Sequence, residues 1–214
     1  TVNHMSVLNN TGILAGASGA VGGGDPYNPK RSTRFNSDDS AHLNWTPTSA
    51  GNQQTWTWSG WMKRGKPGSG QRFFSGISGN NDNDYTSVFF STGDALVIGA
   101  YTYNSRTSNE VFRDPGAWYH LVVAVNLNNS ASTKFRAWMN GTELTWTNTT
   151  NNPTSTGVNS TSIHCLGANN AQGTLSAYTD FNLANVHFID GTAEEPADFG
   201  FTNSTTGQWV PKEY

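Results

Sequence analysis

The stretch Trp118-Tyr119-His120-Leu121-Val122-Val123-Ala124-Val125-Asn126-Leu127 decides the fold class. Alternate residues of a β-strand point to opposite faces of its sheet. With that period, one face of this stretch is wholly apolar, and it consists of Tyr119, Leu121, Val123, Val125 and Leu127. The opposite face is mixed, from His120 to Asn126. The stretch therefore predicts a long strand that lays one side against a core.

A second stretch, Thr55-Trp56-Thr57-Trp58-Ser59, alternates polar and aromatic residues. The same period places Trp56 and Trp58 in the core and turns Thr57 and Ser59 outward. We also expect the large ring of Trp118 to be core packing and not a ligand platform.

Two hairpins connect further strands. Asn140-Gly141 separates Phe135–Met139 from a returning strand over 142–146, and both turn residues tolerate positive φ. Ser91-Thr92-Gly93-Asp94 joins Tyr85–Phe90 to a strand over 95–103. Each hairpin places its two strands side by side and antiparallel.

Strand patterns continue over 163–167 and 181–189, and no stretch shows a sustained period of 3.6 residues with helix caps. Only 193–199 favours a short helical turn. Many short strands without helices between them predict an all-β fold, an antiparallel jelly-roll β-sandwich of two packed sheets. We expect it to occupy residues 32–192. A Gly-rich arm or linker over 1–31 precedes it, and an extension over 193–214 packs on the sandwich or leaves it.

Composition excludes several function classes. The formal net charge of the 214 residues is −3, and no basic cluster exceeds Lys30-Arg31 or Lys63-Arg64, so we expect no nucleic-acid partner. The longest apolar stretches are too short to cross a bilayer, so we expect no membrane insertion. The single cysteine, Cys165, lies in a strand pattern and is expected to be a small buried hydrophobe.

Seven motifs follow one another in a characteristic order along the chain. They are Arg34-Phe35-Asn36, Ala41-His42-Leu43, the run from Thr55 to Arg64, Trp118 to Val125, Trp138 to Thr142, His164 to Ala168, and Phe181 to Gly191. This ordered set resembles the laminin-G-like branch of the concanavalin-A-like lectin/glucanase superfamily over about residues 32–190. Asn182 departs from it, because the family often has glycine there. The resemblance implies a concanavalin-A-like sandwich that binds carbohydrate.

Both ends of the chain resemble virion proteins of marine tailed bacteriophages, through Ala15-Gly16-Ala17, Phe199-Gly200 and the run from Gly207 to Tyr214. That resemblance implies a tail-fibre, appendage or head-decoration role on the virion surface. The implied partners are other virion proteins, further copies of the chain in a homo-oligomer, and host-surface glycan.

Catalysis is not expected. Glycoside hydrolysis needs two carboxylates that flank the scissile bond, and sandwich glucanases carry them as Glu-x-Asp-x-x-Glu on one strand. That pattern is absent, and the acidic pairs present, such as Glu110 with Asp114, lie in turn-like places. The leading hypothesis is a non-catalytic lectin-like module. The alternatives are a purely structural assembly or decoration protein without a glycan ligand, and a diverged glycoside hydrolase.

Carbohydrate binding usually needs exposed aromatic faces beside amides and hydroxyls. Tyr101 and Tyr103 share one face of a predicted strand, and Asn104 and Arg106 follow in the next loop. Trp146, which is followed by polar residues, is a further candidate for carbohydrate binding. Core packing is the competing interpretation for Tyr101, Tyr103 and Trp146.

One acidic loop suggests calcium, which prefers oxygen ligands. Asn80, Asp82 and Asp84 offer such oxygens between two strands, although an ordinary Asn/Asp/Gly turn is the simpler interpretation because the spacing of an EF-hand is absent. The run over 37–40, Ser-Asp-Asp-Ser, is a weaker candidate because adjacent residues of an extended strand point apart.

Overall fold

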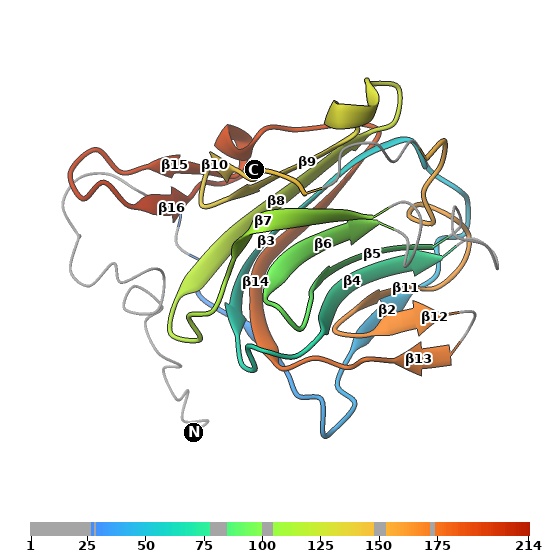
Figure 1. Ribbon diagram of the computed structural model, residues 1–214, viewed down its shortest axis with the longest axis horizontal. Coiled ribbons are helices and arrows are strands. Elements are labelled where there is room, and N and C mark those ends of the chain that lie inside the picture. Colours follow the sequence, from blue (N-terminus) through green and yellow to red (C-terminus); the bar gives the residue numbers. More distant parts are fainter. Residues whose placement is uncertain (1–26, 28, 78–84, 100–104, 148–152, 172–173) are drawn as a thin grey trace, which may run out of the picture.

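The computed structural model describes residues 27, 29–77, 85–99, 105–147, 153–171 and 174–214. Within these residues the chain is nearly all β-structure, as the sequence predicts (Figure 1). None of the helices in this part of the chain has the length and apolarity needed to cross a lipid bilayer.

Two six-stranded antiparallel sheets form the sandwich. In spatial order, the first sheet (sheet A) contains β1 (Thr33–Phe35), β14 (Phe181–Asp190), β3 (Thr55–Arg64), β8 (Trp118–Asn126), β9 (Phe135–Met139) and β10 (Thr142–Glu143). The second sheet (sheet B) contains β2 (Leu43–Trp45), β11 (His164–Leu166), β4 (Gln71–Ile77), β5 (Tyr85–Phe90), β6 (Ala95–Gly99) and β7 (Arg106–Val111).

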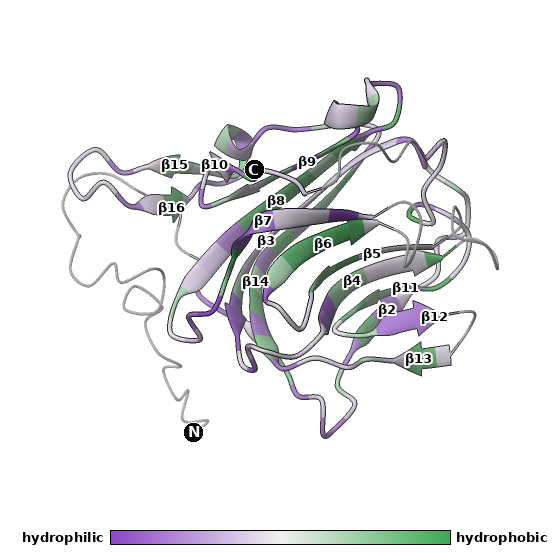
Figure 2. Ribbon diagram, in the orientation of Figure 1, coloured by the Kyte–Doolittle hydropathy of each residue, from purple (hydrophilic) through white to green (hydrophobic). Residues whose placement is uncertain are grey.

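Smaller elements lie around the sandwich. They are the hairpin β12 (Asn169–Ala171) with β13 (Thr174–Ser176), the hairpin β15 (Gly200–Thr202) with β16 (Trp209–Pro211), and the 3-10 turns η2 (Ala131–Thr133) and η3 (Pro196–Asp198). In Figure 2 the β6 strand, buried along its whole length, is hydrophobic, whereas β12 is hydrophilic.

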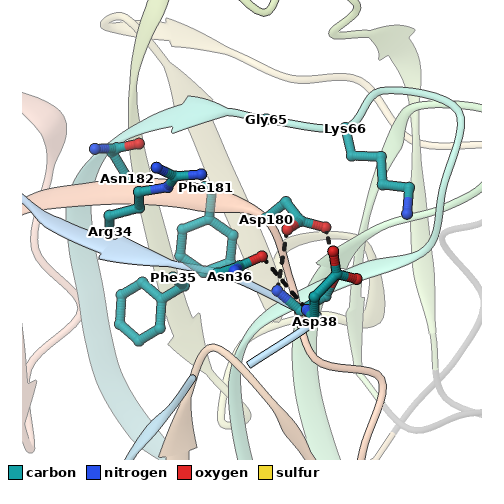
Figure 3. A pocket seen from close by; sticks show the side chains of 10 residues that line it. Arg34, Phe35, Asn36, Asp38, Gly65, Lys66, Asp180, Phe181 and Asn182 are labelled. Carbon is teal, nitrogen blue, oxygen red and sulfur yellow. Dashed lines mark hydrogen bonds between the residues drawn. The ribbon is translucent and has the colours of Figure 1, made fainter. Parts of the chain in front are cut away.

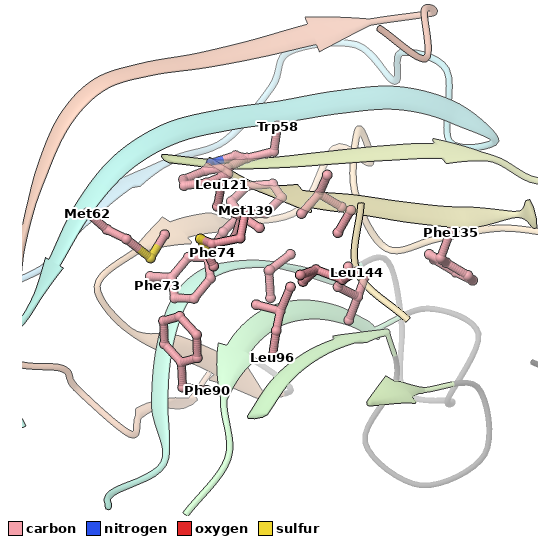
Figure 4. Close-up of a cluster of buried hydrophobic side chains, with 14 of the residues drawn as sticks. Trp58, Met62, Phe73, Phe74, Phe90, Leu96, Leu121, Phe135, Met139 and Leu144 are labelled. Atoms are coloured by element: carbon pink, nitrogen blue, oxygen red, sulfur yellow. The ribbon is translucent and has the colours of Figure 1, made fainter. Parts of the chain in front are cut away.

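The core lies between the sheets and is rich in aromatic rings (Figure 4). Trp56 and Trp58 of β3 are fully buried and contact Phe74 of sheet B, as their alternation predicts. Leu121 and Val123 of β8 belong to the same cluster, which confirms the predicted apolar face. Each large buried side chain contributes about 1.5–3 kcal/mol by leaving water, so these facing rings hold the two layers together.

Both predicted hairpins are present. Asn140 and Gly141 have φ values of 51° and 78° and connect β9 to β10. The returning strand is shorter than predicted, because only Thr142 and Glu143 pair with β9. Further along, Trp146 forms an isolated β-bridge with Ser108 of β7 in the other sheet. In the other hairpin, Asp94 has a φ of 68° and bonds the buried Arg64 at 2.9 Å.

The outer face of sheet A differs from the prediction. Thr57 and Ser59 do point away from the core, but both are fully buried. Residues 192–214 run back over this face, and the hydroxyl of Thr57 donates to the Thr192 carbonyl and accepts the amide of Glu194. A segment far along the chain therefore shields side chains that strand alternation alone would expose to water.

A buried polar chain joins that covering segment to the sheet. The indole Nε1 of Trp209 donates to Nδ1 of His120 at 2.9 Å, and Nε2 of His120 lies 2.9 Å from the Ser59 hydroxyl. Because an indole nitrogen only donates, Nδ1 must accept, and His120 is neutral with its proton on Nε2. Burial, with a smaller contribution from nearby His187, lowers the pKa of His120 to about 3.

Candidate functional site

A polar pocket opens at one rim of the sandwich, where β1, the turn after β3 and the start of β14 meet (Figure 3). Its volume is about 350 Å³, within the range typical of small-molecule sites. Its lining combines both charge signs, two amides and two aromatic rings, and consists of Arg34, Phe35, Asn36, Ser37, Asp38, Gly65, Lys66, Asp180, Phe181 and Asn182.

Strand pairing assembles the pocket. In the antiparallel register of β1 with β14, Arg34 lies opposite Asn182 and Phe35 lies opposite Phe181. The two phenylalanine rings are buried, with centroids 5.0 Å apart, and they connect the pocket to the core. The flanking positions therefore hold Arg34 and Asn182 together at the surface over an apolar support.

Asp180 is the most constrained group of the pocket. Its carboxylate accepts the amide of Ser37 at 3.0 Å and the hydroxyl of Ser37 at 2.7 Å (Figure 3), and its carbonyl accepts the amide of Gly65. Partial burial opposes ionisation, but the bonds from Ser37 and the charges of Lys66 and Arg34 lower the pKa of Asp180 below its ordinary value. It is therefore an ionised, fixed acceptor at neutral pH.

Other polar groups of the pocket have no partner within the protein. Among the described residues, the side chains of Arg34, Lys66, Asn182 and Asp38 make no hydrogen bond within 3.5 Å and no ion pair within 4.0 Å. Arg34, Lys66 and Asp38 are exposed, and Asn182 is half-buried. The pocket thus offers donors and an acceptor around a small volume, as hydroxyl-rich ligands require.

The sequence-predicted carbohydrate residues do not line this pocket. Tyr101, Tyr103 and Asn104 lie outside the described residues. Trp146 is half-buried and packs against the main core cluster.

The interpretation of Arg106 as a surface ligand-binding residue is corrected by its burial. Arg106 is fully buried, its guanidinium donates to the Ala131 carbonyl and its charge lies 6.0 Å from the centre of the Phe135 ring. Burial lowers the pKa of this arginine. Its alternate position on β7 turns it inward, so it has no face left for a ligand at the surface.

The proposed calcium loop with Asn80, Asp82 and Asp84 also lies outside the described residues. In the weaker calcium candidate, the run over 37–40, two side chains already have partners. The Ser37 hydroxyl donates to Asp180, and the Asp39 carboxylate accepts a bond from the Asn36 side-chain amide. Across the described chain, no group of three or more His, Cys, Asp or Glu side chains is placed to hold a metal ion.

Two acids of the sandwich, Glu143 of β10 and Glu110 of β7, have structural partners. Both oxygens of Glu143 accept bonds from Arg136, at 2.8 and 2.9 Å, and these bonds lower the pKa of Glu143. Glu110 accepts the amide and the hydroxyl of Thr145. These bonds fix the end of β10 and the segment that follows it.

Sequence reasoning missed the rim pocket. The motifs Arg34-Phe35-Asn36 and Phe181-Asn182 were visible as strand signals, but nothing in them indicates that they pair with each other across more than 140 residues. Neither motif carries a local signal of the pocket, because the partner segment lies far away in the chain.

Comparison with known proteins supports the architecture. The family model described as the concanavalin A-like lectin/glucanases superfamily matches residues 36–196. The NanB sialidase of Streptococcus pneumoniae is similar over 82% of this chain and 29% of its own, with a TM-score of 0.55 and 17% identity. The CBM40 of the Ruminococcus gnavus IT-sialidase, bound to α2,3-sialyllactose, is similar over 74% of this chain and 95% of its own, with a TM-score of 0.50 and 12% identity. The chain thus spans less than a third of the NanB sialidase, and a search of curated proteins finds no match.

Proposed function

Because the chain belongs to the concanavalin A-like lectin/glucanase superfamily, we propose that it is a non-catalytic module that binds carbohydrate in the rim pocket. The observation that carries this proposal is the set of unpartnered polar groups, from Arg34, Lys66, Asn182 and Asp38, around a volume suited to one or two sugar rings. Each sugar hydroxyl both donates and accepts, so a site with both kinds of group at neutral net charge suits a glycan better than a simple anion or cation.

The similarity to a carbohydrate-binding module supports the class of ligand. The CBM40 structure shares the fold and holds α2,3-sialyllactose. At 12% identity this similarity concerns the fold, so the sugar itself has to come from experiment.

We further propose that the module works on the surface of a phage virion, as part of a tail fibre, appendage or head decoration. The support is the resemblance of both chain ends to virion proteins of marine tailed phages, at 15–17 and 207–214. Repeated copies in a homo-oligomer, beside other virion proteins, would strengthen weak single sites by multivalency.

The test is a glycan array followed by calorimetry on the best ligand. We expect Arg34→Ala and Lys66→Ala each to weaken binding about tenfold or more, because each removes a charged hydrogen bond of about 1.5–3 kcal/mol. Lys30→Ala is the matched control, since Lys30 is exposed and lines neither described pocket. Unchanged affinity in both pocket variants would exclude this pocket.

The same experiment separates the alternatives. If the assembled protein binds no glycan, a purely structural assembly or decoration role replaces the lectin-like one. If the wild type instead hydrolyses a glycan of the array, and the double variant Glu110→Gln with Glu143→Gln does not, the result would favour a diverged glycoside hydrolase.

A further inference from the structure

The two ends of the rim pocket differ in charge. Figure 3 shows Arg34 and Asn182 at one end, and Asp180 and Asp38 at the other. Lys66 lies on the side of the acids. Lys66 and Arg34 both stabilise the ionised form of Asp180, and Lys66 contributes more of the two. The charge of Lys66 is therefore offset within the protein more than the charge of Arg34 is.

Strand register extends the Arg34 end of the pocket across the outer face of sheet A. Arg34 lies opposite Asn182 in the pairing of β1 with β14, and Asn182 lies opposite Lys63 in the pairing of β14 with β3. The chain neighbours Phe181 and Met62 belong to the core, so strand alternation turns Asn182 and Lys63 outward. Arg34, Asn182 and Lys63 thus form a line across three strands, the cationic row.

Both cations of this row are available to a ligand. Arg34 is exposed and Lys63 is half-buried, and neither makes a hydrogen bond or an ion pair with the described residues. The row itself contains no acid. Neighbouring strands lie about 4.8 Å apart, so a negative charge above Asn182 is within one Debye length, about 8 Å at physiological salt, of both cationic strands. The two cations therefore attract the same anionic group.

We infer that the glycan of the rim pocket is acidic, and that the cationic row binds a carboxylate on one of its sugars. This inference rests on the proposed function, because the pocket must first hold a glycan. The sugar hydroxyls donate to Asp38 and Asp180 at the acidic end, where carboxylate oxygens accept more than one bond each. The carboxylate of the ligand lies at the opposite end, over Asn182.

The side chains of the row suit a carboxylate in shape as well as in charge. The guanidinium of Arg34 is planar and can donate two parallel bonds to the two oxygens of one carboxylate. The amide of Asn182 is also planar and adds an uncharged donor, while the ammonium of Lys63 adds a compact positive charge. Two planar donor groups match a planar carboxylate better than a tetrahedral sulfate ester.

Calorimetry with matched probes tests the charge of the ligand. The probes are oligogalacturonate and oligoguluronate, each compared with its methyl ester, which keeps the sugar rings but removes the charge. The ratio of the two affinities is the acid preference. We expect an acid preference of at least about tenfold for one of the two pairs with the wild type, as a charge-assisted hydrogen bond provides. The preference should fall as salt rises.

Two variants of the row test its role. Lys63→Ala should lower the acid preference about threefold, because it removes a partly exposed ion pair. Asn182→Asp should abolish the preference by placing a like charge in the row, and it serves if Lys63→Ala does not fold. Lys66→Ala should weaken the acid and its ester alike. Lys212→Ala is the matched control, since it removes an exposed lysine outside both described pockets and should change neither affinity.

The outcomes distinguish this inference from the proposed function. Equal affinity for each acid and its ester, or binding of neutral array glycans alone, would overturn the acidic ligand and leave the lectin-like module in place. An unchanged acid preference in Asn182→Asp, or an equal loss in Lys63→Ala and Lys66→Ala, would remove the row from the site. A preference for dextran sulfate over dextran that exceeds the acid preference would refute the carboxylate. Absence of binding to every glycan would overturn the proposed function, and this inference with it.

Discussion

The two faces of β3 are both buried, but by different means. On the inner face, Trp56 and Trp58 pack against rings and aliphatic side chains of sheet B. On the outer face, Thr57 and Ser59 are buried through hydrogen bonds to residues 192–209 and to His120. The inner contact depends on apolar area, whereas the outer contact adds hydrogen bonds, which depend on direction, to smaller apolar clusters around Trp61 and Phe199. The inner face therefore carries most of the stability, and the outer face determines where the C-terminal segment lies.

The largest expected effect comes from removing one indole from each face. Trp58→Ala should lower the free energy of unfolding by about 3–5 kcal/mol, because it leaves a cavity in the main core. Trp209→Ala should cost about 2 kcal/mol, since Trp209 is half-buried and loses both its bond to His120 and part of its packing against Trp61 and Trp118. Urea unfolding measures both values. An equal or greater loss for Trp209→Ala would reverse this ranking of the faces.

The second largest effect is a dependence of stability on pH, which arises from His120 on the outer face of sheet A. The pKa of His120 is about 3 in the folded protein and about 6.5 when unfolded, so between these values only the unfolded chain binds the proton. The stabilisation by neutral His120 is complete above about pH 6.5 and is lost as the pH falls towards 3. Between pH 6.5 and 5 the loss from this group is about 2 kcal/mol.

Melting temperatures over that pH interval check this expectation. His120→Gln keeps an acceptor for Trp209 but does not titrate, so its stability should fall less steeply with acid. An identical slope in the variant and the wild type would assign the acid sensitivity to other groups, such as His187 and His164, whose pKa values burial also lowers.

The smallest effect is the difference between two glycine variants, which distinguishes the cost of backbone strain from the cost of crowding at the outer face. Gly141 and Gly191 have φ values of 78° and 85°, and alanine in this region costs about 1–2 kcal/mol. A Cβ at Gly191 meets open space, whereas a Cβ at Gly141 would lie 2.6 Å from the Trp209 ring. Gly141→Ala should therefore cost about 1 kcal/mol more than Gly191→Ala in urea unfolding. Equal losses would mean that the Trp209 ring moves aside freely.

Local sequence signals predicted much of the sandwich. The alternation in 118–127 correctly identified the inner residues of β8, and Asn140-Gly141 correctly identified a hairpin. Both signals act between neighbouring residues, through strand period and turn geometry. Arg106 was misjudged because it follows the predicted strand over 95–103 and was therefore expected at the surface, whereas it lies on β7 and its alternation turns it into the core.

The candidate site could not be predicted in the same way. Arg34 and Asn182 come together only when β1 pairs with β14, and Lys66 joins them from the turn after β3. Asp180 acquires its partner Ser37 from the same pairing. The free energy of that pairing depends on the whole sheet, so no local pattern in the two segments predicts the pocket.

The sequence by itself determined which residues alternate, where the chain turns and that apolar rings such as Trp56 and Trp58 seek a common interior. Only the tertiary structure decided that the outer face of sheet A is covered and that polar groups at 34, 66 and 182 share a pocket. The physical reason is the range over which each effect acts. Strand period and turn preference act over a few residues, whereas the covering of a face and the assembly of a pocket depend on contacts between segments far apart in the chain.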